Sequence, residues 1–300
     1  MSVRIGINPI TWTNDDLPSL GGDTPLETCL RETRQAGYAG AEMGGKFPKR
    51  AAEMKKALDP HGLKLVSGWY SAKLLERGAG EEIAAMAGHL DLMAGMGCKV
   101  MVFAEGAQSN AGNRAAPAST HRRIAEGEWK GYGDRVTEVA AHMLQRGVRL
   151  AFHHHMGTAV QTEGEIGRLM RATGPEVGLL LDTGHATYAG ADPLALARKH
   201  ARRIVHVHCK DVRRPVLDRA LQQGMSFLDS VLAGVFTVPG DGQVDFPPIL
   251  KLLREQGYAG WLVVEAEQDP AKAHPLTYAR MGFEYLSTAA RNAGFAVAHS

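Results

Sequence analysis

The amino-acid sequence predicts a single-domain α/β protein built as an eight-stranded (β/α)₈ TIM barrel over residues 1–300. Three observations lead to this fold. Short apolar runs alternate regularly with longer segments of helical periodicity, and glycine stands at five of the junctions where a helical segment gives way to the next run. In addition, 300 residues are enough for eight strand–helix units in one domain.

Eight short runs rich in β-branched and apolar residues are expected to form the strands. Such strands are apolar on both faces, so they require helices on both sides or closure into a barrel. The runs are Val3–Asn8, Ala39–Met43, Leu63–Gly68, Lys99–Ala104, Val148–His153, Val177–Asp182, Ile204–His208 and Trp261–Glu265.

The segments between these runs have the period of amphipathic helices. In Trp129–Arg146, for example, Arg135 faces water, whereas one stripe is apolar: Val136, Val139, Ala140, Met143 and Leu144. The expected helices are Pro25–Gln35, Lys49–Leu58, Glu81–Met96, Trp129–Arg146, Glu163–Arg171, Pro193–His200, Phe246–Glu255 and Pro275–Asn292.

Glycine stands at five of the junctions between a helical segment and the next strand. A helix commonly ends in a residue of left-handed conformation, which glycine adopts without steric cost. These glycines are Gly37, Gly62, Gly97, Gly147 and Gly257. The main alternative, a doubly wound sheet, is disfavoured because no G-x-G-x-x-G motif follows the first strand.

Two segments are too long to be minimal loops. Glu105–Gly127 is rich in Gly, Ala and Asn, and Lys210–Gly242 has room for two short helices of its own. Both follow strands, so both are expected on the C-terminal face of the barrel, where such folds build their active sites.

Composition and charge exclude several classes of protein. The net charge of +2 and the lack of a long basic block argue against nucleic-acid and anionic-membrane binding. The apolar runs are only strand-sized, and the chain begins directly with a strand pattern, so we expect a cytoplasmic protein. Three widely spaced cysteines indicate neither a disulfide framework nor a cysteine-rich zinc site.

Familiar catalytic motifs are incomplete or missing. Gly40–Lys46 matches the start of a phosphate-binding loop, but Phe47 follows where a Ser or Thr should contact magnesium. The sequence contains no G-x-S-x-G elbow and no H-E-x-x-H zinc helix. Nucleophilic acyl chemistry and a zincin site are therefore unsupported.

Ionisable side chains stand at the ends of the last four expected strands. Residues two apart near a strand end share a face, and the carboxyl ends of the strands of a parallel barrel meet at one rim. The residues concerned are His153 and His155 on the fifth strand, Asp182 on the sixth, His206, His208 and Lys210 on the seventh, and Glu265 and Glu267 on the eighth.

Each of these residues also has a purely structural interpretation. Asp182 could cap the following helix, His206 could be a hydrogen-bonded core residue, and Glu267 could be a solvated loop carboxylate. Their convergence favours another explanation, because several buried ionisable groups are costly unless they are paired or bind a cation. A mixed set of imidazoles and carboxylates suits Mn²⁺, Co²⁺, Zn²⁺ or Fe²⁺.

Several longer strings resemble the inosose (2-keto-myo-inositol) dehydratases, a group within the xylose-isomerase-like sugar isomerase and epimerase barrels. The resemblance covers residues 3 to 290, and the set of strings is more specific than any one of them. The strings are Gly6–Pro9, Trp12–Pro18, Gly21–Asp23, His153–Thr158, Gly178–His185 and Glu265–Pro270.

Position by position, this resemblance implies three of the four metal ligands of the wider family. These are Asp182, His208 and Glu265, and His185 falls on the substrate-binding histidine. The fourth ligand is Glu in the isomerases and epimerases, but this chain has His153 there. Strand register favours His153 as the ligand over His155, and the sequence leaves that choice open.

The resemblance implies loss of water from 2-keto-myo-inositol, with Mn²⁺ or Co²⁺ as the metal and glutathione as a stimulant. Glu265 is expected to be the base, and His155 or Lys210 the acid, because of their direction on the strands. Three polar residues near the first two strands are candidates for reading the ring hydroxyls, although each could equally be a cap or surface residue: Asn14, Glu42 and Lys46.

Three other functions compete with this hypothesis. A sugar or polyol isomerase or epimerase would use the same barrel, but His153 in place of Glu argues against it. An apurinic-site endonuclease would need a basic track for DNA. A non-catalytic polyol-binding protein would hold the ligand without turnover. The expected partner is therefore a small polyol ketone, and the sequence is compatible with a homo-oligomer.

Overall fold

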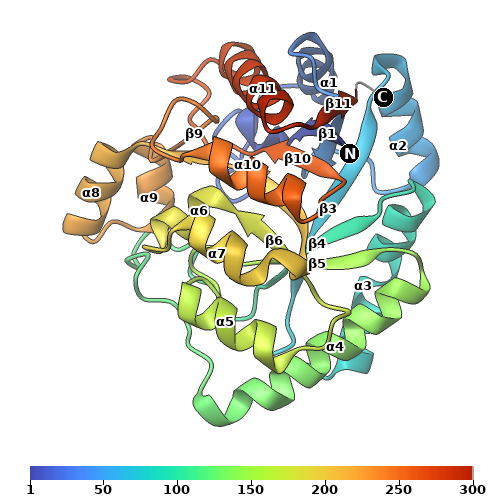
Figure 1. Ribbon diagram of the computed structural model, residues 1–300, viewed down its shortest axis with the longest axis vertical. Helices are drawn as coiled ribbons and strands as arrows, with labels where there is room; N and C mark the ends of the chain where they lie inside the picture. The colour runs from blue at the N-terminus through green and yellow to red at the C-terminus, as the bar shows by residue number, and fades with distance from the viewer. Residues whose placement is uncertain (299–300) are drawn as a thin grey trace.

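The computed structural model describes residues 1–298 and shows a closed barrel of eight parallel strands (Figure 1). The last strand pairs with the first, Arg4 opposite Trp261, which closes the sheet. The single-domain (β/α)₈ prediction is thereby confirmed. The barrel strands are β1 (Ser2–Ile7), β2 (Gly40–Met43), β3 (Lys64–Ala72), β4 (Val100–Glu105), β5 (Arg149–His153), β6 (Gly178–Asp182), β7 (Ile204–Cys209) and β10 (Trp261–Val264).

The eight expected helices surround the barrel, and their ends lie within two residues of the predicted positions. In α4 four members of the predicted stripe are fully buried, namely Val136, Val139, Ala140 and Met143. The fifth, Leu144, is 41% exposed, so its placement on the buried stripe was wrong. Over residues 1–298, no helix has both the length and the apolar character needed to cross a bilayer. The helices are α1 (Leu26–Gln35), α2 (Ala51–Leu58), α3 (Ala79–Gly95), α4 (Trp129–Gln145), α5 (Glu163–Ala172), α7 (Pro193–His200), α10 (Phe246–Glu255) and α11 (Pro275–Asn292).

Some elements were not predicted. Helix α6 (Thr183–Tyr188) begins directly after β6, and β3 runs four residues beyond the expected Gly68. A short strand, β11 (Ala296–Ala298), pairs in parallel with the start of β1. Four 3₁₀ turns complete the fold: η1 (Pro9–Thr11), η2 (Asp59–His61), η3 (Glu126–Glu128) and η4 (Ala201–Arg203).

The two long segments form a cap over the C-terminal end of the barrel. The second contains the two expected short helices, α8 (Arg214–Gln222) and α9 (Phe227–Leu232), together with the antiparallel pair β8 (Asp211–Val212) and β9 (Phe236–Thr237). Arg114 of the first segment donates to Asp229 of α9 over 2.8 Å. A separate buried apolar cluster, which includes Phe227 and Phe236, supports this cap.

The period of two along the strands divides the barrel interior into levels. On β5, Arg149 lines a cavity at the N-terminal end, Ala151 belongs to an apolar cluster, and His153 lies in a polar cluster at the C-terminal end. On β10, Trp261 and Val263 lie in a second interior apolar cluster. The ionisable groups are thus concentrated at the two mouths, with apolar residues between them. His206 is an exception, since it is buried, lines the N-terminal cavity and contacts Glu42 of the other mouth.

All five junction glycines have positive φ, between 62° and 104°, as predicted. At Gly37 the constraint is doubled. Its φ is 104°, and a Cβ atom added there would come within 2.6 Å of the Phe283 ring on α11. At Gly62 φ is 62°, but an added Cβ would meet nothing within 4 Å.

We therefore predict that Gly37→Ala lowers the free energy of unfolding by about 2–4 kcal/mol, since left-handed strain and overpacking add. Gly62→Ala should cost only about 1–2 kcal/mol, the left-handed strain alone. Urea unfolding followed by circular dichroism measures both. Equal costs for the two variants would contradict the role assigned to the Phe283 contact.

Candidate metal centre

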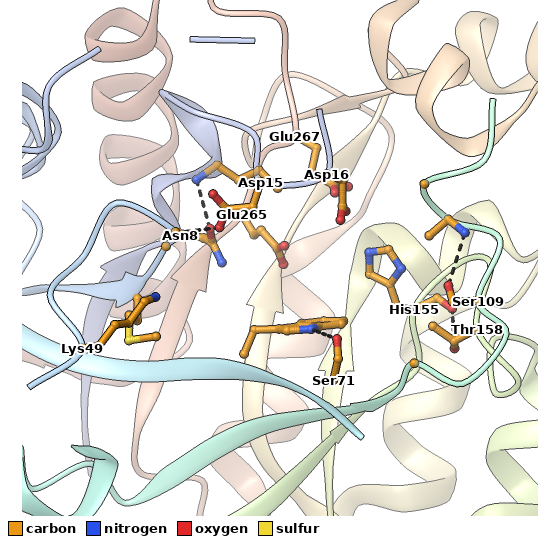
Figure 2. Close-up of a pocket in the computed structure, with 18 residues that line it drawn as sticks. Asn8, Asp15, Asp16, Lys49, Ser71, Ser109, His155, Thr158, Glu265 and Glu267 are labelled. Atoms are coloured by element: carbon orange, nitrogen blue, oxygen red, sulfur yellow. Dashed lines mark hydrogen bonds between the residues drawn. The ribbon is translucent and has the colours of Figure 1, made fainter. Parts of the chain in front are cut away.

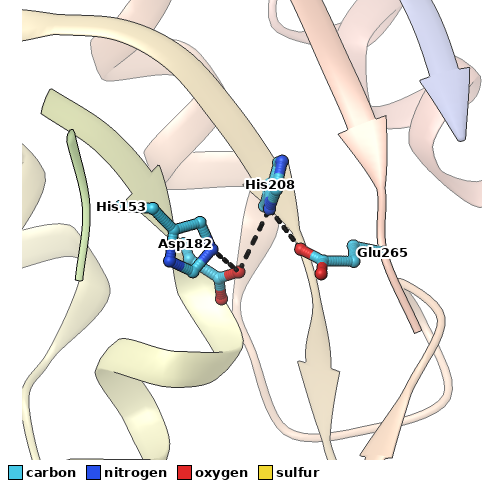
Figure 3. A group of neighbouring side chains, drawn as sticks. All are labelled: His153, Asp182, His208 and Glu265. Carbon is cyan, nitrogen blue, oxygen red and sulfur yellow. Dashed lines mark ion pairs between the residues drawn. The ribbon is translucent and has the colours of Figure 1, made fainter. Parts of the chain in front are cut away.

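Four buried side chains from four neighbouring strand ends meet at the C-terminal mouth of the barrel (Figure 3). They are His153, Asp182, His208 and Glu265, and one ligand atom from each lies within 4.8 Å of all the others. Asp182 Oδ2 is 3.3 Å from His153 Nε2 and 3.4 Å from His208 Nδ1. His208 Nδ1 also contacts Glu265 Oε2.

The atoms that face one another in this cluster fit a metal ion. His153 Nε2, Asp182 Oδ2, His208 Nδ1 and Glu265 Oε2 are all buried, and none makes a hydrogen bond. Buried polar atoms without a partner are rare because they are costly. Two imidazole nitrogens and two carboxylate oxygens are the donor set of a divalent first-row metal, so the cluster is a candidate site for such an ion.

The structure brings His153 rather than His155 into this cluster. The ring of His155 lies 4.0 Å from that of His185, and its Nδ1 is 2.7 Å from the Met156 carbonyl oxygen, to which it donates. His155 Nε2 is therefore left as an acceptor. His154, between them, accepts a hydrogen bond from the backbone N–H of Asp182 over 3.2 Å and so ties β5 to β6.

Asp182 has two tasks at once. Its Oδ2 faces the cluster, while its Oδ1 accepts a 2.8 Å hydrogen bond from the backbone N–H of His185 and caps α6. The structural interpretation of Asp182 as a helix cap is thus correct, and it does not compete with metal ligation. The cap holds the carboxylate in a fixed orientation.

Glu42 lies behind the metal cluster. Its carboxylate accepts hydrogen bonds from His206 Nε2 over 2.8 Å, from His208 Nε2 over 3.3 Å and from Asn8 Nδ2 over 2.9 Å. The bond from His208 Nε2 turns Nδ1 toward Asp182. A carboxylate that fixes a ligand imidazole from its far side is the usual arrangement around a bound metal.

The charges in this region are strongly coupled. Burial disfavours a charged imidazole, but Glu265 and Glu42 raise the pKa of His208 well above its usual value. Burial would raise the pKa of Glu42, yet His208 and His206 lower it below the usual range. A cation at the cluster would take over the positive charge that His208 otherwise carries, so metal binding would release a proton.

Beside the cluster is a cavity of about 390 Å³ (Figure 2). Glu265, Glu267, Asp16 and His155 all line it, and Glu265 and His155 lie apart in the view. Glu267 lies close to His155, since one polar atom of each is within 4.8 Å of the other. Residues within segment 106–112 of the first long loop form part of the cavity wall. One carboxylate, Glu265, thus belongs to both the metal cluster and the cavity.

A second buried group adjoins the first. Lys210 Nζ is 2.9 Å from Glu267 Oε2, 2.9 Å from His185 Nε2 and 3.5 Å from Glu265 Oε1. Burial raises the pKa of Glu267 to about 7, although Lys210 opposes this shift. Lys210 is fully buried behind Glu267, so its ammonium holds the two carboxylates rather than facing the cavity.

The four residues expected to bind substrate have other partners. His185 is fully buried beside Lys210 and is not among the described residues that line the cavity. None of Asn14, Glu42 and Lys46 is among the residues of the described chain that line the cavity. Lys46 Nζ donates to the carbonyl oxygens of Gly22 and Thr24, and Asn14 Oδ1 accepts from two backbone N–H groups of its own turn. Glu42 serves His208. Each side chain is thus occupied by local structure.

Sequence reasoning missed several residues on the cavity wall. Trp69 is 39% exposed and lies in the unpredicted extension of β3. Its ring packs edge-on against those of His153 and His155, with centroid distances of 5.3 and 5.4 Å. Asp15 and Asp16 lie in a string that carries the family resemblance, but spacing alone gives them no role. Asn8 directly follows β1 and lines the cavity. It was the last residue of the first predicted strand, but it was given no role.

Known proteins resemble this chain over nearly its whole length. The family model for the xylose isomerase-like TIM barrel matches residues 30–289. The rhizopine catabolism protein MocC of Rhizobium meliloti is 55% identical over 98% of this chain and 91% of its own. The inosose dehydratase of Geobacillus thermodenitrificans (strain NG80-2) is 44% identical over 95% of this chain and 96% of its own.

Among solved structures, the IOLI protein with a bound zinc atom superimposes with a TM-score of 0.67 at 17% identity, covering 97% of this chain and 98% of that one. This likeness concerns the fold. The chain belongs to the xylose isomerase-like TIM barrel family and, within it, to the group that contains MocC and the inosose dehydratases.

Proposed function

We propose that the protein is a metal-dependent hydro-lyase that removes water from 2-keto-myo-inositol to give a trihydroxycyclohexane-dione in inositol catabolism. One observation carries the proposal most directly. Glu265 belongs both to a buried four-ligand cluster and to the wall of a cavity that also presents Glu267. Membership of a group whose relatives include inosose dehydratases supports the choice of substrate, a small polyol ketone.

The ligands we assign to the metal are His153, Asp182, His208 and Glu265. A divalent cation held there would act as a Lewis acid toward the ketone oxygen of the substrate. Mn²⁺ and Co²⁺ are the ions we favour for this mixed donor set. The bound zinc atom of the IOLI protein, a neighbour in fold, supports a divalent ion in this protein. Stimulation by glutathione is a further expectation, tested by adding it to the same assay.

Glu265 is the base in this proposal. It takes the proton α to the ketone, and the electrons of that C–H bond form the new C=C bond as the β-hydroxyl leaves. Its Oε2 faces the metal cluster, whereas its Oε1 is 3.5 Å from Lys210 Nζ. The ammonium stabilises the carboxylate as an anion and so keeps it ready to accept a proton.

The departing hydroxyl needs a proton, and the geometry favours Glu267 as its source. Glu267 lines the cavity, two residues after Glu265 and on the same side of the chain. With a pKa of about 7 it is protonated in a substantial fraction of molecules at neutral pH. Of the two acids expected from the sequence, Lys210 supports Glu267 from behind. His155 presents a free Nε2, which suits acceptance of a hydrogen bond from a substrate hydroxyl.

A second candidate function is a related step of rhizopine catabolism, because the relative at 55% identity carries that name. An isomerase or epimerase on the same barrel is the other alternative. Mass spectrometry of purified protein incubated with 2-keto-myo-inositol and Mn²⁺ separates the dehydratase from the isomerase or epimerase. Loss of one water supports the dehydratase, unchanged mass indicates an isomerase, and no reaction would contradict both.

We predict that a chelator abolishes dehydration and that Mn²⁺ or Co²⁺ restores it. Asp182→Asn should retain the cap of α6, since Asn caps as well as Asp, while losing the ligand charge and the metal. The matched control is Asp192→Asn at the N-cap of α7, which should keep both metal and activity. Metal content by elemental analysis and circular dichroism check these outcomes. Full activity in a metal-free preparation would contradict the proposal.

We predict that Glu42→Gln weakens metal affinity by about 10- to 100-fold, the usual cost of removing an outer partner of a ligand histidine. Competition with a fluorescent chelator measures this affinity. Glu165→Gln is the control, because Glu165 also accepts from a histidine, His121, at 2.7 Å but stands outside the site. Equal affinity in the two variants would show that Glu42 does not position His208.

Glu265→Gln also removes a ligand charge, so it is assayed at saturating Mn²⁺ with its metal content measured. In the metal-loaded variant we predict that the turnover number falls by about 10²–10⁴-fold through loss of the general base, while substrate binding largely persists. Stopped assays and isothermal titration measure the two effects. Exposed Glu255→Gln on α10 should behave as wild type. In the wild type, substrate deuterated at the abstracted position should react more slowly where that step limits the rate. Near-normal turnover in Glu265→Gln would place the base elsewhere.

A further inference from the structure

The opposite, N-terminal mouth of the barrel contains a basic cavity of about 410 Å³. The strand alternation that places metal ligands at one mouth places arginines at the other, since Arg149 stands four residues before His153 on β5. The cavity is bordered by residues from distant parts of the chain, so no basic block marks it in the sequence. Its cationic side chains are Arg4 of β1, Lys99 before β4, Arg149 of β5 and Arg202 of η4.

These four positive charges lack negative partners. No Asp or Glu between residues 1 and 298 lines the cavity. None of the four cations forms an ion pair within 4.0 Å with a described carboxylate, whereas many other surface cations of this protein do. Like charges gathered in a concave, partly apolar site repel one another and raise the local concentration of anions.

One of the arginines is built into the wall. Arg149 donates from one terminal nitrogen to the Pro175 carbonyl oxygen over 3.0 Å, while its Nε is buried without a partner. The guanidinium of Arg4 stacks 4.3 Å above the Trp261 ring. Both groups are therefore held in place before any ligand arrives, and guanidinium groups match the oxygens of a phosphoryl group with two parallel hydrogen bonds.

A buried histidine provides an independent indication of a ligand. His206 is completely buried, lines the cavity, and has no partner for its Nδ1. Its Nε2 donates to Glu42 over 2.8 Å, so Nδ1 is available as an acceptor. A buried acceptor without a donor is unfavourable. A ligand hydroxyl would satisfy it.

We propose that this cavity binds a small phosphorylated compound that also carries a hydroxyl group. The cations hold the phosphoryl oxygens, His206 accepts from the hydroxyl, and the apolar faces of Trp261 and Val205 cover the carbon frame. A cavity of about 410 Å³ lies in the size range of small-molecule sites and suits a sugar phosphate. The four cations lie at the mouth opposite the metal cluster, and His206 connects the two sites through Glu42. The proposal does not depend on the proposed dehydration.

The test uses isothermal titration of the full-length, metal-loaded protein at low ionic strength with ribose 5-phosphate, inorganic phosphate and ribose. Ribose 5-phosphate should bind, and ribose should not. The double variant Lys99→Gln/Arg202→Gln removes two exposed cations from the cavity and should lose about tenfold or more in affinity, since charge-assisted hydrogen bonds are the strong ones.

The matched control is Lys64→Gln/Lys251→Gln, which removes the same charge from exposed positions outside this cavity and should retain wild-type affinity. Both double variants should keep the catalytic activity of the wild type, which shows that they fold. Equal affinity of the two double variants for ribose 5-phosphate, or no binding by the wild type, would overturn the site. Equal affinity for inorganic phosphate and ribose 5-phosphate would overturn the hydroxyl contact with His206.

Discussion

The imidazole of His208 is held from both sides by carboxylates, and the candidate site depends on this arrangement. Glu42 fixes Nε2, while Asp182 and Glu265 face Nδ1. Three anionic groups around one buried ring would repel one another strongly in a medium of low dielectric constant. Positive charge at the centre is therefore required for the fold as well as for chemistry, and it comes from a proton on His208 or from a bound cation.

The barrel supplies the frame for that arrangement. Each ligand comes from a different strand end, and parallel pairing fixes the register, for example Asp182 opposite His208. Apolar side chains fill the barrel interior next to the site, so the ligand side chains are kept at the C-terminal mouth. Asp182 is fixed further by its role as the cap of α6. The geometry of the site is therefore set mostly by backbone hydrogen bonds, which a single side-chain substitution leaves in place.

Much of this could be predicted from sequence because it follows from local rules. Short apolar, β-branched runs located the strands, glycines located helix ends, and i, i+2 spacing separated His153 and His155 from His154. The role of Glu42 could not be predicted. Glu42 lies on the four-residue strand β2, and its contacts with His206 and His208 of β7 depend on the register of the whole barrel, which is a long-range property. Trp69 escaped for another reason: the run Gly68–Ala72 contains polar and exposed positions, so it has no apolar pattern although it continues β3. The short helix α6 follows a strand without any loop, where periodicity gives no boundary.

In the proposed reaction, the placement of the carboxylates favours elimination over isomerisation. The resemblance implies that isomerase barrels place two carboxylates on opposite sides of the substrate, which suits passing a proton from one carbon to the next. Here His153 occupies one of those positions, and an additional carboxylate, Glu267, shares the Lys210 ammonium with Glu265. In the proposed reaction Glu265 would take the proton and Glu267 would protonate the departing hydroxyl, and Lys210 holds the two carboxylates close to each other. Replacing His153 by Glu would add a fourth anion near His208 and restore the opposed pair of carboxylates. We therefore expect this substitution to weaken dehydration.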